Sequence, residues 1–154
     1  MATLRLSHIG LCVAELERSI SFYCEVLGFQ ELSRLALSGE APATLLQVPG
    51  GQVQAVYLER DGMRIELLYY PQAGHEGGEA PRPMNRAGLT HLSFRVVDLD
   101  ATVAAVLRAG GHCLEDTRVN TPEYRSQVVF VTDPDGTRIE LLQAPGDINA
   151  LPGS

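Results

Sequence analysis

Residues 61–68 read DGMRIELL, and residues 135–142 read DGTRIELL. The two octapeptides differ at one position only. Asp-Gly is a turn signal between antiparallel strands, and the alternation of apolar and polar letters after it is typical of a half-buried strand. Each octapeptide therefore predicts the turn and second strand of a hairpin, with a glutamate, Glu66 or Glu140, inside the strand.

The repeat is longer than these octapeptides. The stretch LSHI at residues 6–9 matches LTHL at residues 89–92, and the same offset aligns Gly28 with Gly111. The octapeptides align at a smaller offset, so the first copy carries extra residues, which we place in the Gly- and Pro-containing stretch 38–51. Internal repetition of this kind predicts two copies of one structural module.

Each copy predicts a strand, a helix and then three strands. Alternation over residues 4–13 and 89–97 predicts the first strands, and apolar residues on one helical face predict helices within 14–27 and from Leu99 to Leu107, the second with Asp98 as its N-cap. The remaining strands are predicted at 29–37, 52–59 and 63–70, and at 112–115, 126–132 and 137–143. The fold class is thus α+β, with βαβββ modules at 1–71 and 89–143, a Gly- and Pro-rich linker at 72–88 and a tail at 144–154.

Composition excludes several classes of function. A net charge of −7 disfavours nucleic acid and anionic membranes as partners, because both call for basic patches. No stretch approaches the run of about 20 apolar residues that a membrane span needs. The three cysteines include no C-x-x-C pair, and the N-terminus lacks a secretory pattern, so we expect a cytoplasmic protein with free thiols.

Strand parity places the histidines and glutamates on particular faces. His8 shares a face with Gly10 and Cys12, and His91 shares one with Ser93 and Arg95, opposite the apolar residues that a helix would cover. By the same rule Glu66 shares its face with Leu68 and Tyr70, and Glu140 shares its face with Leu142. A single glutamate or histidine in a strand is most often a solvent-facing or hydrogen-bonded bystander. An apolar residue and a tyrosine beside the carboxylate favour the wall of a cleft.

Two histidines and two glutamates recur at equivalent places in the two copies. Imidazole and carboxylate together suit a divalent metal ion of borderline hardness, such as Zn, Mn, Fe, Co or Ni. Four such ligands leave two positions of an octahedral shell for water or a bidentate substrate. His75 and His112 have no counterpart in the other copy, so we predict that neither belongs to the site.

The chain resembles the vicinal oxygen chelate superfamily, which includes glyoxalase I, bleomycin resistance proteins and dioxygenases. Three stretches carry the resemblance: the opening strand and helix with HIGL at residues 8–11, the run GLTHLSFRV at residues 88–96, and the closing DPDGTRIEL at residues 133–141. The resemblance implies two βαβββ modules forming a cupped mixed sheet around a metal site, often in a homodimer. It also implies that the family's metal ligands fall on His8, Glu66, His91 and Glu140.

The resemblance further implies a small-molecule substrate and proton transfer next to a carbonyl. Glu140 and Glu66 are then the candidates for ligand and base, and we expect a lyase or isomerase acting on a 2-oxo, 2-hydroxy or thioester compound. Cys12 and Tyr70 stand where glyoxalase I has an arginine and an asparagine, while Arg95 supplies a cation on the second module. These three residues are candidates for the substrate pocket. The alternatives are a non-catalytic binding protein of the bleomycin resistance type and a metal-dependent dioxygenase.

Overall fold

The computed structural model describes residues 5–77 and 80–149, and the chain divides into two compact units between residues 77 and 78. Residue 4 of the first predicted strand, residues 78 and 79 of the predicted linker and residues 150–154 of the predicted tail lie outside the described residues. Each unit has a sheet of its own, with four strands in mixed orientation. The predicted α+β class and the two βαβββ-like modules are confirmed.

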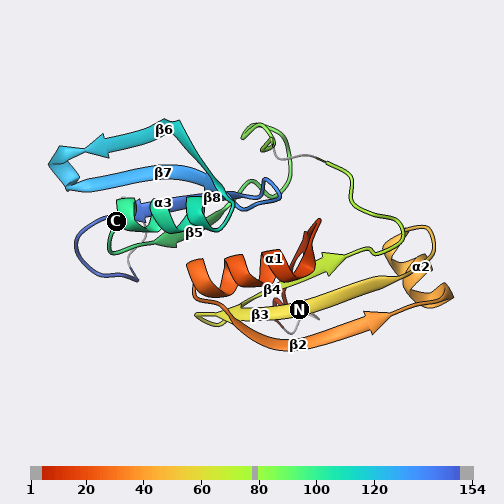
Figure 1. Ribbon diagram of the computed structural model, residues 1–154. Coiled ribbons are helices and arrows are strands. Elements are labelled where there is room, and N and C mark those ends of the chain that lie inside the picture. The colour runs from red at the N-terminus through yellow and green to blue at the C-terminus, as the bar shows by residue number, and fades with distance from the viewer. Residues whose placement is uncertain (1–4, 78–79, 150–154) are drawn as a thin grey trace. The chain divides into compact units, whose positions relative to one another are not determined.

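The first unit contains one predicted set of elements and one additional helix. Its elements are β1 (Ile9–Cys12), α1 (Leu16–Ser21), a π-helical turn (Phe22–Val26), β2 (Gln30–Leu37), α2 (Glu40–Leu46), β3 (Val53–Arg60) and β4 (Met63–Tyr69). The strand order is β1-β4-β3-β2, with β1 parallel to β4 and the other pairs antiparallel. Figure 1 shows α1 lying along one face of this sheet and α2 beyond the ends of β2 and β3.

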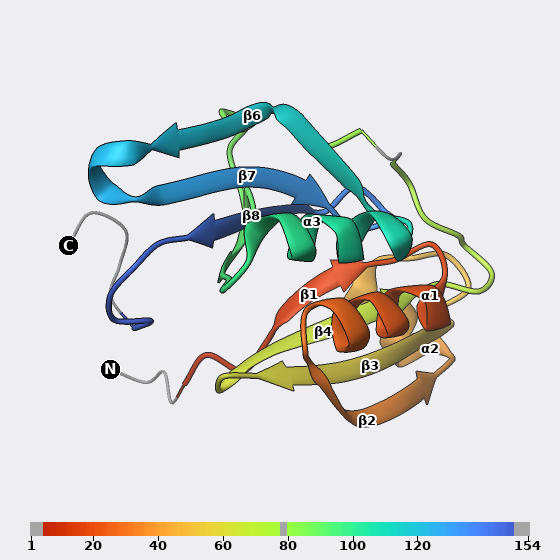
Figure 2. The same cartoon turned by 60° about the vertical axis from the view of Figure 1, so that its left-hand side comes forward.

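The second unit repeats this arrangement without the extra helix. Its elements are β5 (Leu92–Arg95), α3 (Leu99–Arg108), β6 (His112–Thr121), a 3₁₀ turn (Pro122–Tyr124), β7 (Ser126–Thr132) and β8 (Arg138–Gln143). The strand order is β5-β8-β7-β6, again with the first pair parallel. Figure 2 shows α3 lying against one face of this sheet.

One face of each sheet forms a hydrophobic core with the helix of its own unit. In the first unit Val56 and Leu58 of β3 are register partners of Leu67 and Ile65 of β4, and all four are buried. In the second unit the corresponding residues of β7 and β8 are Val129, Val131, Ile139 and Leu141. Burial of each such side chain stabilises the fold by about 1.5–3 kcal/mol. The opposite face of each sheet is left for the polar residues.

The turn of the first hairpin and the cap of α3 act as the sequence predicts. Asp61 and Gly62 both have positive φ, at 53° and 76°, as a two-residue hairpin turn requires. The Asp98 side chain accepts a hydrogen bond from the backbone N–H of Ala101 at 2.9 Å, so it caps α3. None of the helices in the described part of the chain is long and apolar enough to cross a membrane.

Two elements differ from the prediction. The extra residues of the first copy fold into α2, whose seven residues are too few to show a helical period and include no buried side chain. Gly51 closes this insertion with φ +58°, and the position requires glycine because a Cβ there would lie 2.4 Å from the Gly39 carbonyl oxygen. Strand β6 extends to Thr121 instead of ending at 115, since its polar second half lies at the sheet edge, beyond a register shift between Leu114 and Val119.

Candidate functional site: two histidine–glutamate pairs

In the first unit, parallel pairing of β1 and β4 brings His8 beside Glu66. Gly10 is the register partner of Glu66. His8 lies two residues before Gly10 and therefore on the same face of the sheet. The distance from His8 Nε2 to Glu66 Oε2 is 3.1 Å. The imidazole is 33% exposed and the carboxylate 15% exposed, so the pair is accessible to a ligand yet partly shielded from water.

Tyr57 supports this first pair from the neighbouring strand. It is the register partner of Glu66 on β3, and its ring packs edge-on against the His8 ring with centroids 5.2 Å apart. The tyrosine side chain also hydrogen-bonds to Glu66, and this bond, followed by burial and by the carboxylate charge, raises the pKa of Tyr57 to about 12. Tyr57 therefore stays a neutral hydrogen-bond donor at physiological pH.

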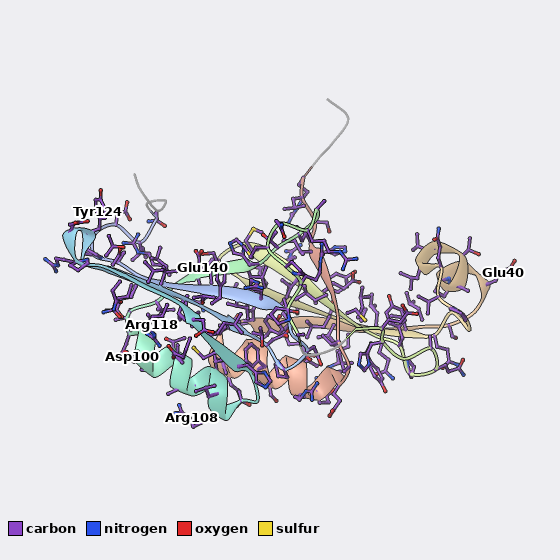
Figure 3. All side chains as sticks on the ribbon, turned by 90° about the horizontal axis from the view of Figure 1, so that it is seen from above. Glu40, Asp100, Arg108, Arg118, Tyr124 and Glu140 are labelled. Atoms are coloured by element: carbon purple, nitrogen blue, oxygen red, sulfur yellow. The ribbon has the colours of Figure 1, made fainter. Side chains whose placement is uncertain are left out.

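The second unit holds the equivalent pair, His91 and Glu140. Ser93 is the register partner of Glu140, and its hydroxyl donates a hydrogen bond to Glu140 Oε1 at 2.8 Å. His91 Nε2 lies 4.0 Å from Glu140 Oε2, and the His91 ring packs edge-on against Phe130 with centroids 5.4 Å apart. Figure 3 shows Glu140 on the side of the sheet away from α3.

A hydroxyl meets the other ring nitrogen of each histidine. Ser7 Oγ lies 3.1 Å from His8 Nδ1, and Thr90 Oγ1 lies 2.9 Å from His91 Nδ1. A hydroxyl can donate or accept, so it orients each ring with Nε2 toward the glutamate in either tautomer. Ser7 and Thr90 were not predicted as site residues, although both precede a repeated histidine. Tyr57 was not predicted either, because its counterpart Phe130 is not polar and so no polar residue repeats at this position.

The pocket candidates of the first unit, Cys12 and Tyr70, lie on the same side of its sheet. Cys12 is exposed and is the register partner of Leu68, two residues along β4 from Glu66. Tyr70 follows the end of β4, and burial raises the pKa of its hydroxyl, with smaller contributions from Cys12 and Glu66. The role of both residues in binding a substrate stays a prediction.

Arg95, the pocket candidate of the second unit, contacts the backbone that follows β8. Its guanidinium donates hydrogen bonds to the carbonyl oxygens of Ala144 at 3.0 Å and Pro145 at 2.6 Å, and also to that of Asp147. The side chain thus fixes the segment after β8, a structural role that was not predicted from the sequence. Whether Arg95 also meets a substrate stays a prediction.

The two histidines that are predicted to lie outside the site are His75 and His112. His75 is exposed in the segment after β4, and His112 begins β6 as the register partner of Thr132. Across residues 5–77 and 80–149, no three His, Cys, Asp or Glu side chains gather into a group that could hold a metal ion. Each unit by itself supplies one imidazole nitrogen and one carboxylate, half of the donor set that the sequence predicts.

Comparison with known proteins identifies the family. Residues 5–141 match the profile of the Glyoxalase/Bleomycin resistance protein/Dioxygenase superfamily, which is nearly the whole chain. The chain belongs to this superfamily. The resemblance that the sequence motifs carry is therefore confirmed, and the matched range spans both units.

Similar proteins in the superfamily include lactoylglutathione lyases and a glyoxalase family protein of known structure. The chain is 35% identical over 145 residues to a probable lactoylglutathione lyase of Vibrio parahaemolyticus, covering 93% of each chain. It is 33% identical over 145 residues to a lactoylglutathione lyase of Haemophilus influenzae, covering 91% of this chain and 93% of that one. A similar structure is a glyoxalase family protein from Bacillus cereus, with a TM-score of 0.78 at 22% identity over 95% of this chain and 99% of that chain. This structural likeness supports the fold.

Proposed function

We propose that this protein is a metal-dependent lyase of the glyoxalase I type, which moves a proton next to a carbonyl of a small 2-oxo, 2-hydroxy or thioester compound. The names of its relatives support this reaction class. The observation that carries the proposal is the repeated pair: in each unit a histidine Nε2 faces a glutamate carboxylate on the sheet face that the helix leaves open.

The metal ligands in this proposal are His8, Glu66, His91 and Glu140. Glyoxalase I family members typically use a divalent metal ion. The donors present fit such an ion, because two neutral imidazoles and two carboxylates match the preferences of Zn, Ni, Mn, Co or Fe. When bound, the ion would act as a Lewis acid that makes the proton beside the substrate carbonyl more acidic.

Glu140 is the residue to which we assign the proton transfer. Ser93 holds its Oε1, whereas Oε2, which lies 4.0 Å from His91, is the oxygen left to meet a substrate. In a hemithioacetal, Glu140 takes the proton from the carbon that bears sulfur and returns it to the neighbouring carbon, while the hydroxyl proton of the first carbon passes to the oxygen of the second. The product is the isomeric 2-hydroxyacyl thioester, so no oxidant or further reactant is consumed. Glu66 is held by both His8 and Tyr57 and serves as the more fixed carboxylate.

The proposal is tested by metal content and turnover measured together. Protein purified without added metal is analysed for bound ions, reloaded with each of the five metals, and supplied with hemithioacetals of glutathione and a 2-oxoaldehyde. We expect one ion per chain and conversion to a thioester only in the loaded protein. Protein that binds small molecules tightly but converts none of the hemithioacetals or acyl thioesters would support the binding-protein alternative instead.

The family resemblance also leads us to propose a homodimer. Sedimentation velocity at several concentrations tests this proposal, since a dimer of 16.7 kDa chains is well separated from the monomer. A single species of monomer mass at every concentration, in metal-loaded protein, would contradict it.

A further inference from the structure

The repeat places an arginine two residues before each glutamate. Arg64 precedes Glu66 on β4, and Arg138 precedes Glu140 on β8, in both cases on the same face as the glutamate. Two residues of strand span about 6.6 Å. A ligand bound at the glutamate could therefore also contact the arginine through a group several bonds away. The two arginines nevertheless have different surroundings.

In the first unit, Arg64 has an internal carboxylate. Glu59 on β3 is its register partner, and Arg64 Nε donates a hydrogen bond to Glu59 Oε2 at 2.8 Å. The two side chains are similarly half-buried, at 36% and 34% exposure. The charge of Arg64 is therefore balanced within the unit.

In the second unit, the corresponding partner carries no charge. Thr132 on β7 is the register partner of Arg138 and takes the place that Glu59 has in the first unit. Arg138 donates to the backbone carbonyl of Arg82 at 3.0 Å, and its guanidinium carbon lies 5.2 Å from the centre of the Phe130 ring. Within the described residues, these contacts include no carboxylate.

Two buried polar atoms at this place have no hydrogen-bond partner among the described residues: Nε of Arg138 and Oγ1 of Thr132. Thr132 is 1% exposed, so its hydroxyl does not reach bulk water. A buried donor without an acceptor bears the full cost of its desolvation, and the cost is greatest for a charged group. In the first unit the corresponding atom, Arg64 Nε, has an acceptor, because it donates a hydrogen bond to the Glu59 carboxylate.

We propose that Arg138 and Thr132 form a binding site for a carboxylate of the substrate, in the position that the Glu59 carboxylate occupies in the first unit. The assignment of this carboxylate to a substrate rests on the proposed function, whereas the anion site itself does not. A carboxylate oxygen accepts from Arg138 and from the Thr132 hydroxyl, and it replaces the neutral Arg82 carbonyl because charge-assisted hydrogen bonds are stronger. The Phe130 ring supports the guanidinium by a cation–π contact, and the His91 ring packs edge-on against Phe130 in turn.

The site lies next to the proposed base on the same strand. A substrate whose reacting carbon meets Glu140 would place a carboxylate about 6.6 Å away at Arg138. The substrate class is therefore a 2-oxo or thioester compound with a carboxylate several bonds from the reacting carbon. Neutral thiol adducts would lack this contact.

Metal-free protein gives the sharpest test, because the anion site needs no metal. The ¹Hε–¹⁵Nε NMR signal of Arg138 is followed while glutathione, which has two carboxylates, is added, and again with glutathione diethyl ester, which has none ionised. We expect the signal to shift with glutathione only. Calorimetry on the same samples should show binding at least tenfold weaker for the ester.

Three substitutions sharpen the test. Arg138→Met should weaken glutathione binding at least tenfold, whereas Arg64→Met, which removes an already paired arginine, should leave it unchanged. Thr132→Glu should abolish binding by supplying an internal carboxylate as in the first unit. Conversely, Glu59→Thr should create a second carboxylate site at Arg64 and raise the binding stoichiometry by one.

Several outcomes would overturn the proposal. Equal affinity for glutathione and its ester would show that the carboxylates do not contribute to binding. Unchanged affinity in Arg138→Met would show that they are recognised elsewhere. An Arg138 signal that glutathione does not shift would mean that no carboxylate of glutathione binds at these two atoms. If Thr132→Glu fails to fold, Arg138→Met still decides the question. A protein that binds carboxylates at Arg138 but converts no substrate would refute the proposed function alone.

Discussion

The hydroxyl of Ser93 holds Glu140 Oε1 at 2.8 Å, while Gly10 occupies the same position beside Glu66 and offers no hydroxyl. The first unit compensates with Tyr57, which hydrogen-bonds to Glu66 from the opposite neighbouring strand. Phe130 stands at the Tyr57 position of the second unit and cannot donate such a bond. Each carboxylate therefore receives one hydroxyl, but from opposite sides, and the two glutamates are not equivalent in their freedom to move.

Removal of the Ser93 hydroxyl should release Glu140. We expect Ser93→Ala to lower turnover about tenfold, the effect of losing one hydrogen bond to a charged group worth about 1.5 kcal/mol. Ser93→Thr keeps the hydroxyl and should retain most activity. Adding Phe130→Tyr to Ser93→Ala should restore part of the loss, because the new phenol mimics Tyr57. Steady-state kinetics of the loaded variants measure these effects, and full activity in Ser93→Ala would show that the bond has no role.

Metal binding should depend on the paired histidines and not on the others. His8→Ala and His91→Ala should each lose most of the bound metal while keeping the thermal transition of the metal-free protein, because neither ring lies in a helix-covered core. His75→Gln and His112→Gln serve as matched controls and should bind metal normally. Metal analysis by mass spectrometry decides the matter: full stoichiometry in both alanine variants would refute the site.

Cys113 should react slowly with alkylating reagents at neutral pH. Burial, followed by the hydrogen bond to Glu115, raises the pKa of this thiol from about 9 to about 11. The stability that these contacts contribute is therefore present below pH 9 and is lost as the pH rises through 11. The alkylation rate of Cys113, followed by peptide mapping, should rise about tenfold per pH unit up to pH 11. In Glu115→Gln the midpoint should fall toward 9, and an unaltered midpoint would argue against the Glu115 contact.

The buried face of the first sheet should dominate the stability of its unit. Leu58 is fully buried, and Leu58→Ala should reduce the free energy of unfolding by about 2–5 kcal/mol. Leu35 on β2 is 44% exposed, so Leu35→Ala is a matched control with an expected loss well below that range. Urea unfolding of the metal-free variants measures both values. Comparable losses would mean that the exposed face of β2 is covered in solution.

Much of the fold could be predicted from the repeat. Alternation around Ile65 and Leu67 located β4, and the same letters located β8, because a strand with one buried face must alternate. Helix α2 could not be predicted in this way, since it buries no side chain and so leaves no apolar period. The polar second half of β6 was missed for the same reason: an edge strand carries little burial signal.

Only those residues of the candidate site that repeat in both units could be predicted from the sequence. His8 and His91, with Glu66 and Glu140, could be placed on open faces by parity alone. Tyr57 and Ser93 could not be predicted from the repeat, because each acts in one unit and has no polar counterpart in the other. The role of Arg138 could not be predicted for a different reason. The repeated arginine is visible in the sequence, but the lack of a carboxylate partner becomes apparent only from the pairing of Arg138 with Thr132 across the sheet.

Glu140→Gln gives the most direct test of the central claim. Glutamine keeps an oxygen donor of nearly the same shape but cannot take up a proton, so this variant should still bind metal. The measurement is the rate of hemithioacetal isomerisation per bound metal ion, with metal content determined on the same sample. The proposed function predicts a loss of about 10²–10⁴-fold relative to the wild type. Metal-loaded Glu140→Gln that isomerises the substrate at the wild-type rate would contradict it.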